Sequence, residues 1–225
     1  MRWIAKTTML SIRPFEAKDR ASLMNIAADT AFFGEPIEKY LDDRRIFQDY
    51  FYAYYTDFEA EHAWVAIAGQ KVVGFLTGCF DSKVQISITR RKLLPKVLLR
   101  LFSGRYMLGI KTWNYFINQK QAQRSEYCPY VNLQDYPAHL HINVDQNWRG
   151  CGIGHHLMQI YLDQLMYAGI VGVHLGTTSE NEAACRMYAQ FGFKLLDEKP
   201  TRQWKAFIDH PAFARAYGLK LPETR

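Results

Sequence analysis

The sequence predicts a mixed α/β (α+β) fold, with a central mixed β-sheet of about seven strands flanked by helices. One sign is a hairpin, because two apolar stretches at residues 63–68 and 72–76 flank the turn Gly69-Gln70. Another is the C-terminal half, where strand-like and helix-like apolar patterns alternate as they do in crossover connections. With 225 residues, 48% of them hydrophobic, the chain can fill one sizeable core.

In the N-terminal half, residues 10–14 are predicted as the first strand and residues 17–30 as a helix with one apolar side. Residues 37–54 form a second helical stretch that is rich in aromatic residues. The hairpin then supplies the second and third strands. Residues 83–136 are predicted as a helical insertion that precedes the fourth strand.

The C-terminal half contains the remaining elements. Its predicted helices cover residues 152–167 and 182–190, and its predicted strands cover residues 139–144, 171–175, 193–196 and 204–208. Residues 209–225 are expected to form a C-terminal tail. Because no internal repeat, low-complexity segment or long linker interrupts the pattern, residues 1–225 are predicted to form a single domain.

The insertion carries the basic charge of the chain. Ten Lys and Arg residues and no acidic residue lie between Lys83 and Ser125, so this segment is +10 and the rest of the chain, within a total of +6, is −4. A basic amphipathic helix with Pro95 in its first turn is predicted from apolar residues at helical spacing, namely Leu93, Leu94, Val97, Leu98, Leu101 and Phe102. Its charged face is either simply solvated or meets an anionic substrate, a membrane surface or nucleic acid.

Several classes of protein are excluded by other features. The longest apolar runs are shorter than the roughly 18 residues of a membrane-spanning helix, and the N-terminal stretch lacks the apolar centre of a signal peptide. We therefore expect a cytoplasmic protein. The spacing of Cys79, Cys128, Cys151 and Cys185 fits neither paired zinc ligands nor a compact disulfide framework, so we expect reduced thiols and no metal site.

A glycine-rich turn joins a predicted strand to a predicted helix at residues 144–154. Glycines at such a junction let consecutive amide N–H groups point outward at the positive end of the helix dipole, where phosphate binds. The turn is not a P-loop, because the Lys and Ser/Thr are missing, and His155 stands where a dinucleotide fingerprint has its third glycine. A purely structural tight turn is the alternative interpretation.

The motif Arg149-x-x-Gly152-x-Gly154 resembles the acyl-CoA pyrophosphate loop of the GNAT superfamily of N-acetyltransferases. A second signature of that superfamily follows at the right separation, with Asn181-Glu182-Ala183-Ala184, Tyr188 and Phe191-Gly192-Phe193. Residues 136–142 and 172–176 further resemble a subgroup of bacterial acetyltransferases related to the acetyltransferase-like domain of O-GlcNAcases. The resemblance does not cover the basic insertion.

This resemblance implies a GNAT-like sheet and an acetyl-CoA-dependent N-acetyltransferase, with acetyl-CoA as cosubstrate and direct transfer in a ternary complex. The residues implied to hold the pyrophosphate, mainly through main-chain amides, are Arg149, Gly150, Cys151, Gly152, Ile153 and Gly154. The backbone of Ile142, Asn143 and Val144 would pair with the pantetheine arm and the thioester oxygen. Asn181, with Ala184 of the same motif, belongs to the cofactor site, and Tyr188 would donate a proton to the departing thiolate.

The general base is left open between two histidines. His139 and His141 share one face of a predicted strand and titrate near neutrality, so either could relay the proton of the amine. Their alternative role is that of satisfied buried histidines, and a strand bulge would reverse their facing. Asn143 stands where an acidic residue is expected in several relatives, so no carboxylate base is available there.

Three functions remain as hypotheses. The leading one is the N-acetyltransferase, acting on a small-molecule or peptide amine, with an anionic acceptor as one option. The second is a non-catalytic acyl-CoA-binding protein of the same fold. The third, a nucleic-acid-binding module built on the basic segment, is not expected because its aromatic residues recur at the helical spacing of a core. The acceptor and the oligomeric state are not specified by the sequence.

Overall fold

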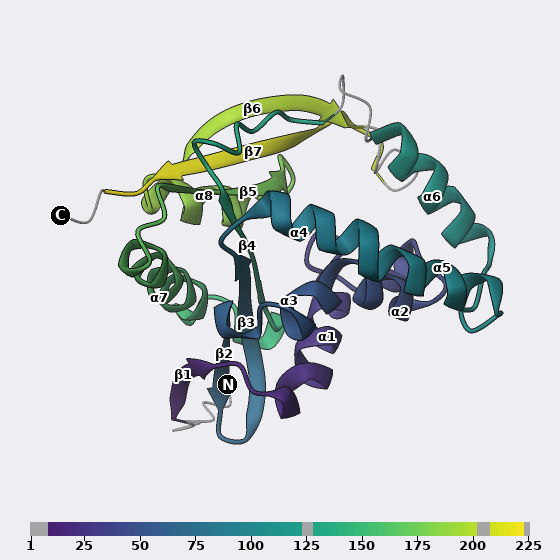
Figure 1. The fold of residues 1–225 in the computed structure, drawn as a ribbon, viewed down its shortest axis with the longest axis horizontal. Helices are drawn as coiled ribbons and strands as arrows, with labels where there is room; N and C mark the ends of the chain where they lie inside the picture. The colour runs from purple at the N-terminus through teal and green to yellow at the C-terminus, as the bar shows by residue number, and fades with distance from the viewer. Residues whose placement is uncertain (1–8, 123–127, 202–207, 223–225) are drawn as a thin grey trace, which may run out of the picture.

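The computed structural model describes residues 9–122, 128–201 and 208–222, which fold around a seven-stranded mixed sheet (Figure 1). Its strand order is β1-β2-β3-β4-β5-β7-β6. The strands are β1 (Leu10–Pro14), β2 (Ala63–Ala68), β3 (Lys71–Cys79), β4 (Ala138–Val144), β5 (Gly172–Thr178), β6 (Lys194–Thr201) and β7 (Ala212–Lys220). β4 and β5 run parallel, and every other neighbouring pair is antiparallel. The predicted mixed sheet is confirmed.

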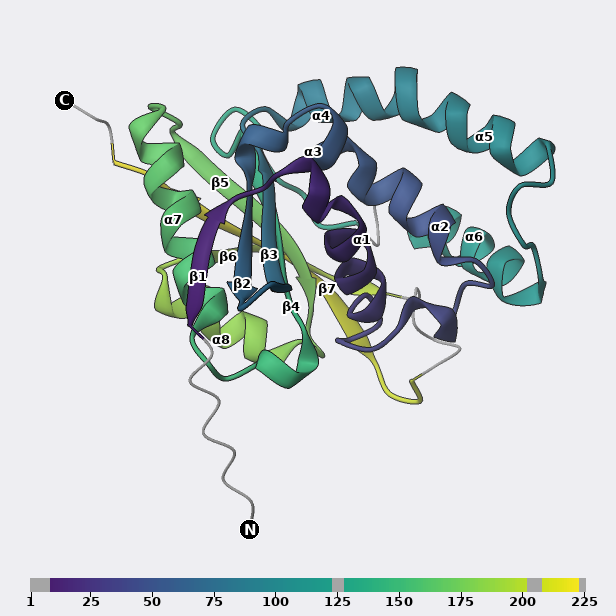
Figure 2. The same ribbon diagram turned by 90° about the horizontal axis from the view of Figure 1, so that it is seen from below.

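Helices cover both faces of this sheet. They are α1 (Arg20–Asp29), α2 (Arg44–Phe47), α3 (Ala53–Asp57), α4 (Ser82–Ile88), α5 (Leu94–Phe102), α6 (Ile110–Ala122), α7 (Ile153–Tyr167) and α8 (Glu182–Gln190). Figure 2 shows α7 on one face and α1 and α3 on the other. The fully buried Leu157, Tyr161 and Leu165 of α7 pack against β3 and β4, while Leu23 of α1 packs against Phe75 on the opposite face. Together these contacts form the two halves of the core.

The sheet opens between β4 and β5. These strands pair only at Ala138 with Val173 and at His139 with His174. Beyond His139, β4 continues beside β3 as far as Val144, and β5 continues beside β7. The edge of β4 that faces β5 therefore has no partner strand from Leu140 onward, and its backbone groups remain available to water or a ligand.

β4 itself is regular. Its register against β3 runs without a shift from Gly74 opposite Val144 to Cys79 opposite His139. Side chains therefore alternate, and His139, His141 and Asn143 share one face, as their spacing predicts. The bulge that could have reversed them is not in β4; register shifts occur instead in the β2–β3 pair and in β6.

The insertion between β3 and β4 is helical, as predicted, but its long helix begins earlier than expected. Asp81 caps it by accepting from the backbone N–H groups of Lys83 and Val84, at 2.8 and 3.2 Å. α4, a π-helical segment (Thr89–Leu93) and α5 then form one continuous helix. Pro95 lies in the first turn of α5, after the π-helical segment. Of the predicted apolar face, Leu93 and Val97 are buried, whereas Phe102 is 83% exposed.

The C-terminal segment corrects the prediction of a tail over residues 209–225. Residues 212–220 form β7, which is an internal strand between β5 and β6. Alanine and glycine are frequent in β7 and have low strand propensity, so the usual β-branched pattern is weak there. Apart from Ile208, the strand predicted over residues 204–208 lies outside the described residues. In the described parts of the chain, no helix combines the length and the apolar character needed to cross a bilayer.

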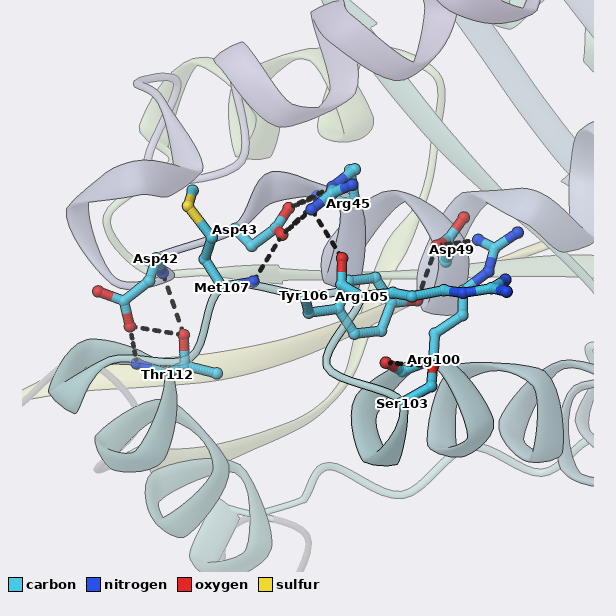
Figure 3. A network of polar contacts seen from close by, with 10 residues as sticks. All are labelled: Asp42, Asp43, Arg45, Asp49, Arg100, Ser103, Arg105, Tyr106, Met107 and Thr112. Carbon is cyan, nitrogen blue, oxygen red and sulfur yellow. Dashed lines mark hydrogen bonds and ion pairs between the residues drawn. The ribbon is translucent and has the colours of Figure 1, made fainter.

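Two adjacent carboxylates anchor the insertion to the segment that precedes α2 (Figure 3). Asp42 accepts hydrogen bonds from the backbone N–H of Gly109 at 2.8 Å and from the backbone N–H and hydroxyl of Thr112 at 2.9 and 2.7 Å. Asp43 accepts from the backbone N–H of Met107 at 3.0 Å. Because Thr112 is fully buried, its polar groups depend on Asp42.

Replacement of this anchor should loosen the insertion and leave the sheet intact. We expect Asp42→Ala to lower the free energy of unfolding by about 1–3 kcal/mol, because it leaves buried donors without acceptors. Hydrogen exchange should show faster exchange in α5 and α6 but not in β3 or β4. Asp57→Ala, which removes only exposed contacts with Arg20 and with the hydroxyl of Thr56, is the control and should change stability by less than about 0.5 kcal/mol. Faster exchange throughout the sheet would contradict this division.

Candidate active site

The glycine-rich turn has the geometry of an anion site. Gly152 is the N-cap of α7, and both Gly150 and Gly152 have left-handed backbones, with φ of 77° and 76°. A Cβ at Gly150 would contact nothing within 4 Å, so the backbone conformation, and not a lack of space, requires glycine there. None of the amide N–H groups of residues 150–155 donates to another described residue. These amides lie at the N-terminus of α7, where the helix dipole is positive.

A cavity of about 480 Å³ lies between this turn, the free edge of β4 and α8. The predicted cofactor residues that line it are Ile142, Asn143, Val144, Arg149, Gly150, Gly152, Ile153, Gly154, Asn181 and Ala184, and Tyr188 lines it as well. Cys151 is exposed and does not line the cavity. Thr30, Phe33 and Gly34, which carry no sequence signal, complete the wall.

Arg149 connects the turn to the loop after α1. Its guanidinium donates to the carbonyl oxygen of Gly34 at 2.8 Å and to that of Val144 at 3.3 Å. A Cβ at Gly34 would come within 2.8 Å of this guanidinium, and the left-handed backbone of Gly34, with a φ of 87°, favours glycine there. Arg149 thus forms part of the wall of the cavity, together with Gly150 and Gly152 beside it.

Tyr188 lies on α8 where the two motifs meet. Its ring is 6% exposed and packs against Phe193 and Tyr217, with centroids 6.0 and 5.8 Å apart. Its hydroxyl makes no hydrogen bond to another described residue, and burial raises its pKa, so it is protonated at neutral pH. Asn181 caps the same helix by accepting from the backbone N–H of Ala184 at 3.3 Å. Tyr188 is therefore both a core residue and a wall of the cavity.

A second cavity of about 540 Å³ adjoins the first along β4. His139, Leu140 and His141 line the second cavity, and the next residue, Ile142, lines the first. Its remaining walls come from β5, the segment around α3 and the long helix of the insertion. Two substrates could therefore meet at the point where β4 leaves β5.

The two histidines belong to one hydrogen-bond network. The hydroxyl of Tyr55 lies 2.5 Å from Nε2 of His139 and 3.0 Å from Nε2 of His141. On its other side, Nδ1 of His139 lies 2.8 Å from Oγ of Ser82 and 3.0 Å from Sγ of Cys79. The sequence identified the two histidines as candidate site residues. It did not identify Tyr55, Ser82 and Cys79 as their partners, because no motif contains them.

Asn143 is held by two further residues that sequence reasoning missed. Its side-chain N–H donates to the hydroxyl of Thr30 at 2.7 Å, and its side-chain oxygen accepts from the hydroxyl of Tyr52 at 3.1 Å. Both polar ends of the amide are therefore satisfied within the protein. Asn143 links β4 to α1 and to the segment before α3, next to the junction of the cavities.

The proton positions follow from counting donors and acceptors. When Ser82 donates to the carbonyl oxygen of Pro137, at 2.7 Å, its oxygen accepts from Nδ1–H of His139. Nε2 of His139 then accepts from Tyr55, whose oxygen accepts from Nε2–H of His141. This assignment, made from the network, leaves Nδ1 of His141 with a free lone pair.

Burial corrects the expectation that these histidines titrate near neutrality. It lowers the pKa of His139 well below the ordinary value, and the nearby rings of His141 and His174 lower it further. His141 lines the second cavity, and desolvation by the surrounding protein, followed by the charge of a protonated His174, lowers its pKa to about 4. Burial also raises the pKa of the Cys79 thiol to about 12. At pH 7 the network is uncharged.

The described residues contain no group of three or more His, Cys, Asp or Glu side chains placed to hold a metal ion. All four cysteines are free, in agreement with the sequence.

The depressed histidine pKa values predict a pH dependence of stability. Protonation of these rings is favoured in the unfolded chain, with a pKa of about 6.5, so the free energy of unfolding should fall as the pH drops from there toward the folded value of about 4. The double variant His139→Gln/His141→Gln should show a shallower fall over the same range. Denaturant titrations at graded pH measure both curves. Identical slopes in the two proteins would show that the histidines titrate normally.

Comparisons with known proteins agree with this geometry. Residues 115–193 match the acetyltransferase (GNAT) family model. A mycothiol acetyltransferase from Nocardiopsis dassonvillei is 41% identical over 56 residues, which are 25% of this chain and only 17% of that protein. The crystal structure of SsHAT is 26% identical, with a TM-score of 0.70, and the match covers 95% of this chain and 99% of that one. The structure of yncA, a putative acetyltransferase from Salmonella typhimurium with its cofactor acetyl-CoA, is 13% identical, with a TM-score of 0.56 and coverage of 96% and 95%.

Proposed function

We propose that this chain, of which residues 115–193 match the GNAT acetyltransferase family model and whose fold is similar to that of SsHAT, is an acetyl-CoA-dependent N-acetyltransferase that moves the acetyl group directly to a primary amine in a ternary complex. The observation that carries this proposal is the opening between β4 and β5, with an anion-binding turn on one side and a histidine-lined cavity on the other. Acetyl-CoA supplies the reactive thioester. The structure of yncA, which is similar in fold, contains acetyl-CoA as its cofactor.

The polar groups that line the first cavity match those of coenzyme A. The unpaired amides of residues 150–155 would hold the pyrophosphate, and the free backbone edge of Ile142, Asn143 and Val144 would pair with the amides of the pantetheine arm. A backbone N–H of that edge would also stabilise the oxyanion that forms during transfer. Asn181 and Ala184 complete the binding wall, and no metal is needed for these contacts.

His141 is the base that the network supports best. Tyr55 fixes its tautomer, so Nδ1 can take the proton of the attacking amine, whereas both ring nitrogens of His139 are already occupied within the network. Because the pKa of His141 is low, it is a weak base, and the amine has to enter in its neutral form. Tyr188 would donate the proton that the departing thiolate needs.

The subgroup resemblance and the kind of acceptor, both expected from the sequence, are part of the same proposal. The resemblance to the acetyltransferases related to the O-GlcNAcase domain rests on residues 136–142 and 172–176, which lie beside each other where β4 pairs with β5. The acceptor is a small-molecule or peptide amine, without a nucleic-acid partner. A cytoplasmic location remains a prediction.

Acetyl-CoA should stabilise the folded protein through the glycine turn. At about 100 times its dissociation constant the ligand adds roughly 2.7 kcal/mol of stability, measured as a rise in melting temperature. Gly152→Val should abolish most of this rise, because valine disfavours the left-handed backbone that aims the amides. Gly104→Val is the control: Gly104 has a φ of 67° and open space, but lies after α5. An undiminished rise in folded Gly152→Val would exclude the turn as the cofactor site.

A variant of Tyr188 can distinguish proton donation by its hydroxyl from packing of its ring in the core. Tyr188→Phe should lower kcat by about 10² or more and leave the affinity for acetyl-CoA nearly unchanged, because the hydroxyl acts on developing charge. Tyr217→Phe, whose ring packs against Tyr188 outside the cavity, is the control. A rise only in KM for acetyl-CoA would make Tyr188 a binding residue.

The assay itself tests the general proposal. Release of free coenzyme A with a panel of amines is compared with a buffer blank that measures plain thioester hydrolysis. Acetyl-CoA binding without transfer to any amine would favour a non-catalytic acyl-CoA-binding protein of the same fold.

A further inference from the structure

The charge inside the second cavity is strongly one-sided. Among the described residues that line it, Arg90 alone is charged at neutral pH, since His139, His141 and His174 have lowered pKa values. No lining residue is Asp or Glu. The cavity therefore offers a positive charge and no carboxylate that could hold an ammonium group.

The guanidinium of Arg90 forms no ion pair or side-chain hydrogen bond with the residues that the structure describes. No described carboxylate forms an ion pair with it, whereas Arg100, further along the same helix, pairs with Asp49. The neighbouring Arg91 and Lys92 are also exposed and raise the local positive potential. An anion that enters the cavity would therefore meet an uncompensated guanidinium.

Local helix geometry also marks this wall. Arg90 and Thr89 lie in the π-helical segment Thr89–Leu93, and Tyr50 and Phe51 lie in a second π-helical segment, Gln48–Tyr52. The two segments contact each other, and both line the cavity. π-helical turns are rare and recur at functional sites. Their pairing here indicates that this wall is shaped for a ligand.

We propose that the acceptor is an amine that also carries a carboxylate or phosphate group, and that Arg90 binds this anionic group while the amine approaches His141. This inference rests on the proposed N-acetyltransferase function. Guanidinium binds either anion through paired N–H groups. Phe51, Ile86 and Leu94 provide apolar walls for the hydrocarbon between the two polar ends. A polyamine is disfavoured, because its second cation would face Arg90 without a carboxylate partner.

Matched pairs of acceptors test this assignment. We would compare ω-amino carboxylates and ω-amino phosphates of increasing chain length with the uncharged alkylamines of the same length. At the best length, the anionic group should raise kcat/KM of the native protein by about 10- to 100-fold, as expected for a charge-assisted hydrogen bond. The two anionic series show which anion the site takes.

Variants locate the effect. Arg90→Gln should remove the preference, by lowering kcat/KM for the anionic amines toward the value for the alkylamines, and Arg90→Lys should retain part of it. Arg91→Gln is the matched control, because Arg91 is adjacent, exposed and does not line the cavity. A preference that persists in Arg90→Gln, or that is lost equally in Arg91→Gln, would overturn the proposal, as would alkylamines being the better acceptors.

A binding measurement keeps the inference separate from the proposed function. The same compounds are added in the presence of free coenzyme A, and the rise in melting temperature is recorded for the native protein and Arg90→Gln. If no amine is acetylated but anionic amines stabilise only the native protein, the catalytic proposal fails and the anion site stands. If amines are acetylated without any anionic preference, the anion site is refuted and the enzyme remains.

Discussion

The parting of β4 from β5 after two residue pairs is the constraint on which the site depends. A strand edge carries a row of N–H and C=O groups that cannot be buried without partners. Here residues 140 and 141 line the second cavity and residues 142–144 line the first, and none of them pairs with β5. Because the edge remains accessible, it can act as a template for any ligand with its own amides, and the flanking cavities give such a ligand two directions of approach.

The parting point is held from the opposite face of the sheet. The hydroxyl of Tyr161, on α7, donates to the carbonyl oxygens of Cys79 and His139 at 3.2 and 3.1 Å. Gly78 makes room for this ring, since any side chain there would collide with it. His139 is thus fixed at its backbone by α7 and at its ring by Tyr55 and Ser82. The histidine at the opening is among the most constrained residues of the site.

The sequence predicted those parts of the site whose signal is local. The turn at residues 149–154 and the helix over residues 182–190 depend on neighbours within a few residues, and the common face of His139 and His141 follows from strand alternation. Tyr55, Ser82 and Arg90 come from segments far apart in the chain, so no spacing reveals them. The prediction of histidine pKa values near neutrality was wrong because burial sets these values. The π-helical segments were not predicted because the sequence analysis searched for a helical period of 3.6 residues. The alanines and glycine of β7 hid an internal strand.

The position of β7 has a consequence for synthesis of the protein. β5 pairs with β4 at only two positions but with β7 along its whole length, so most of its strand pairing is with the strand that comes last in the described part of the chain. Until residue 220 leaves the ribosome, β5 and β6 both lack this central partner. The nascent chain therefore passes through a stage with two open strand edges beside an apolar core, in which pairing with other chains competes with folding. Chaperone contact during this interval would protect β5, which lines the second cavity with His174, Leu175 and Gly176.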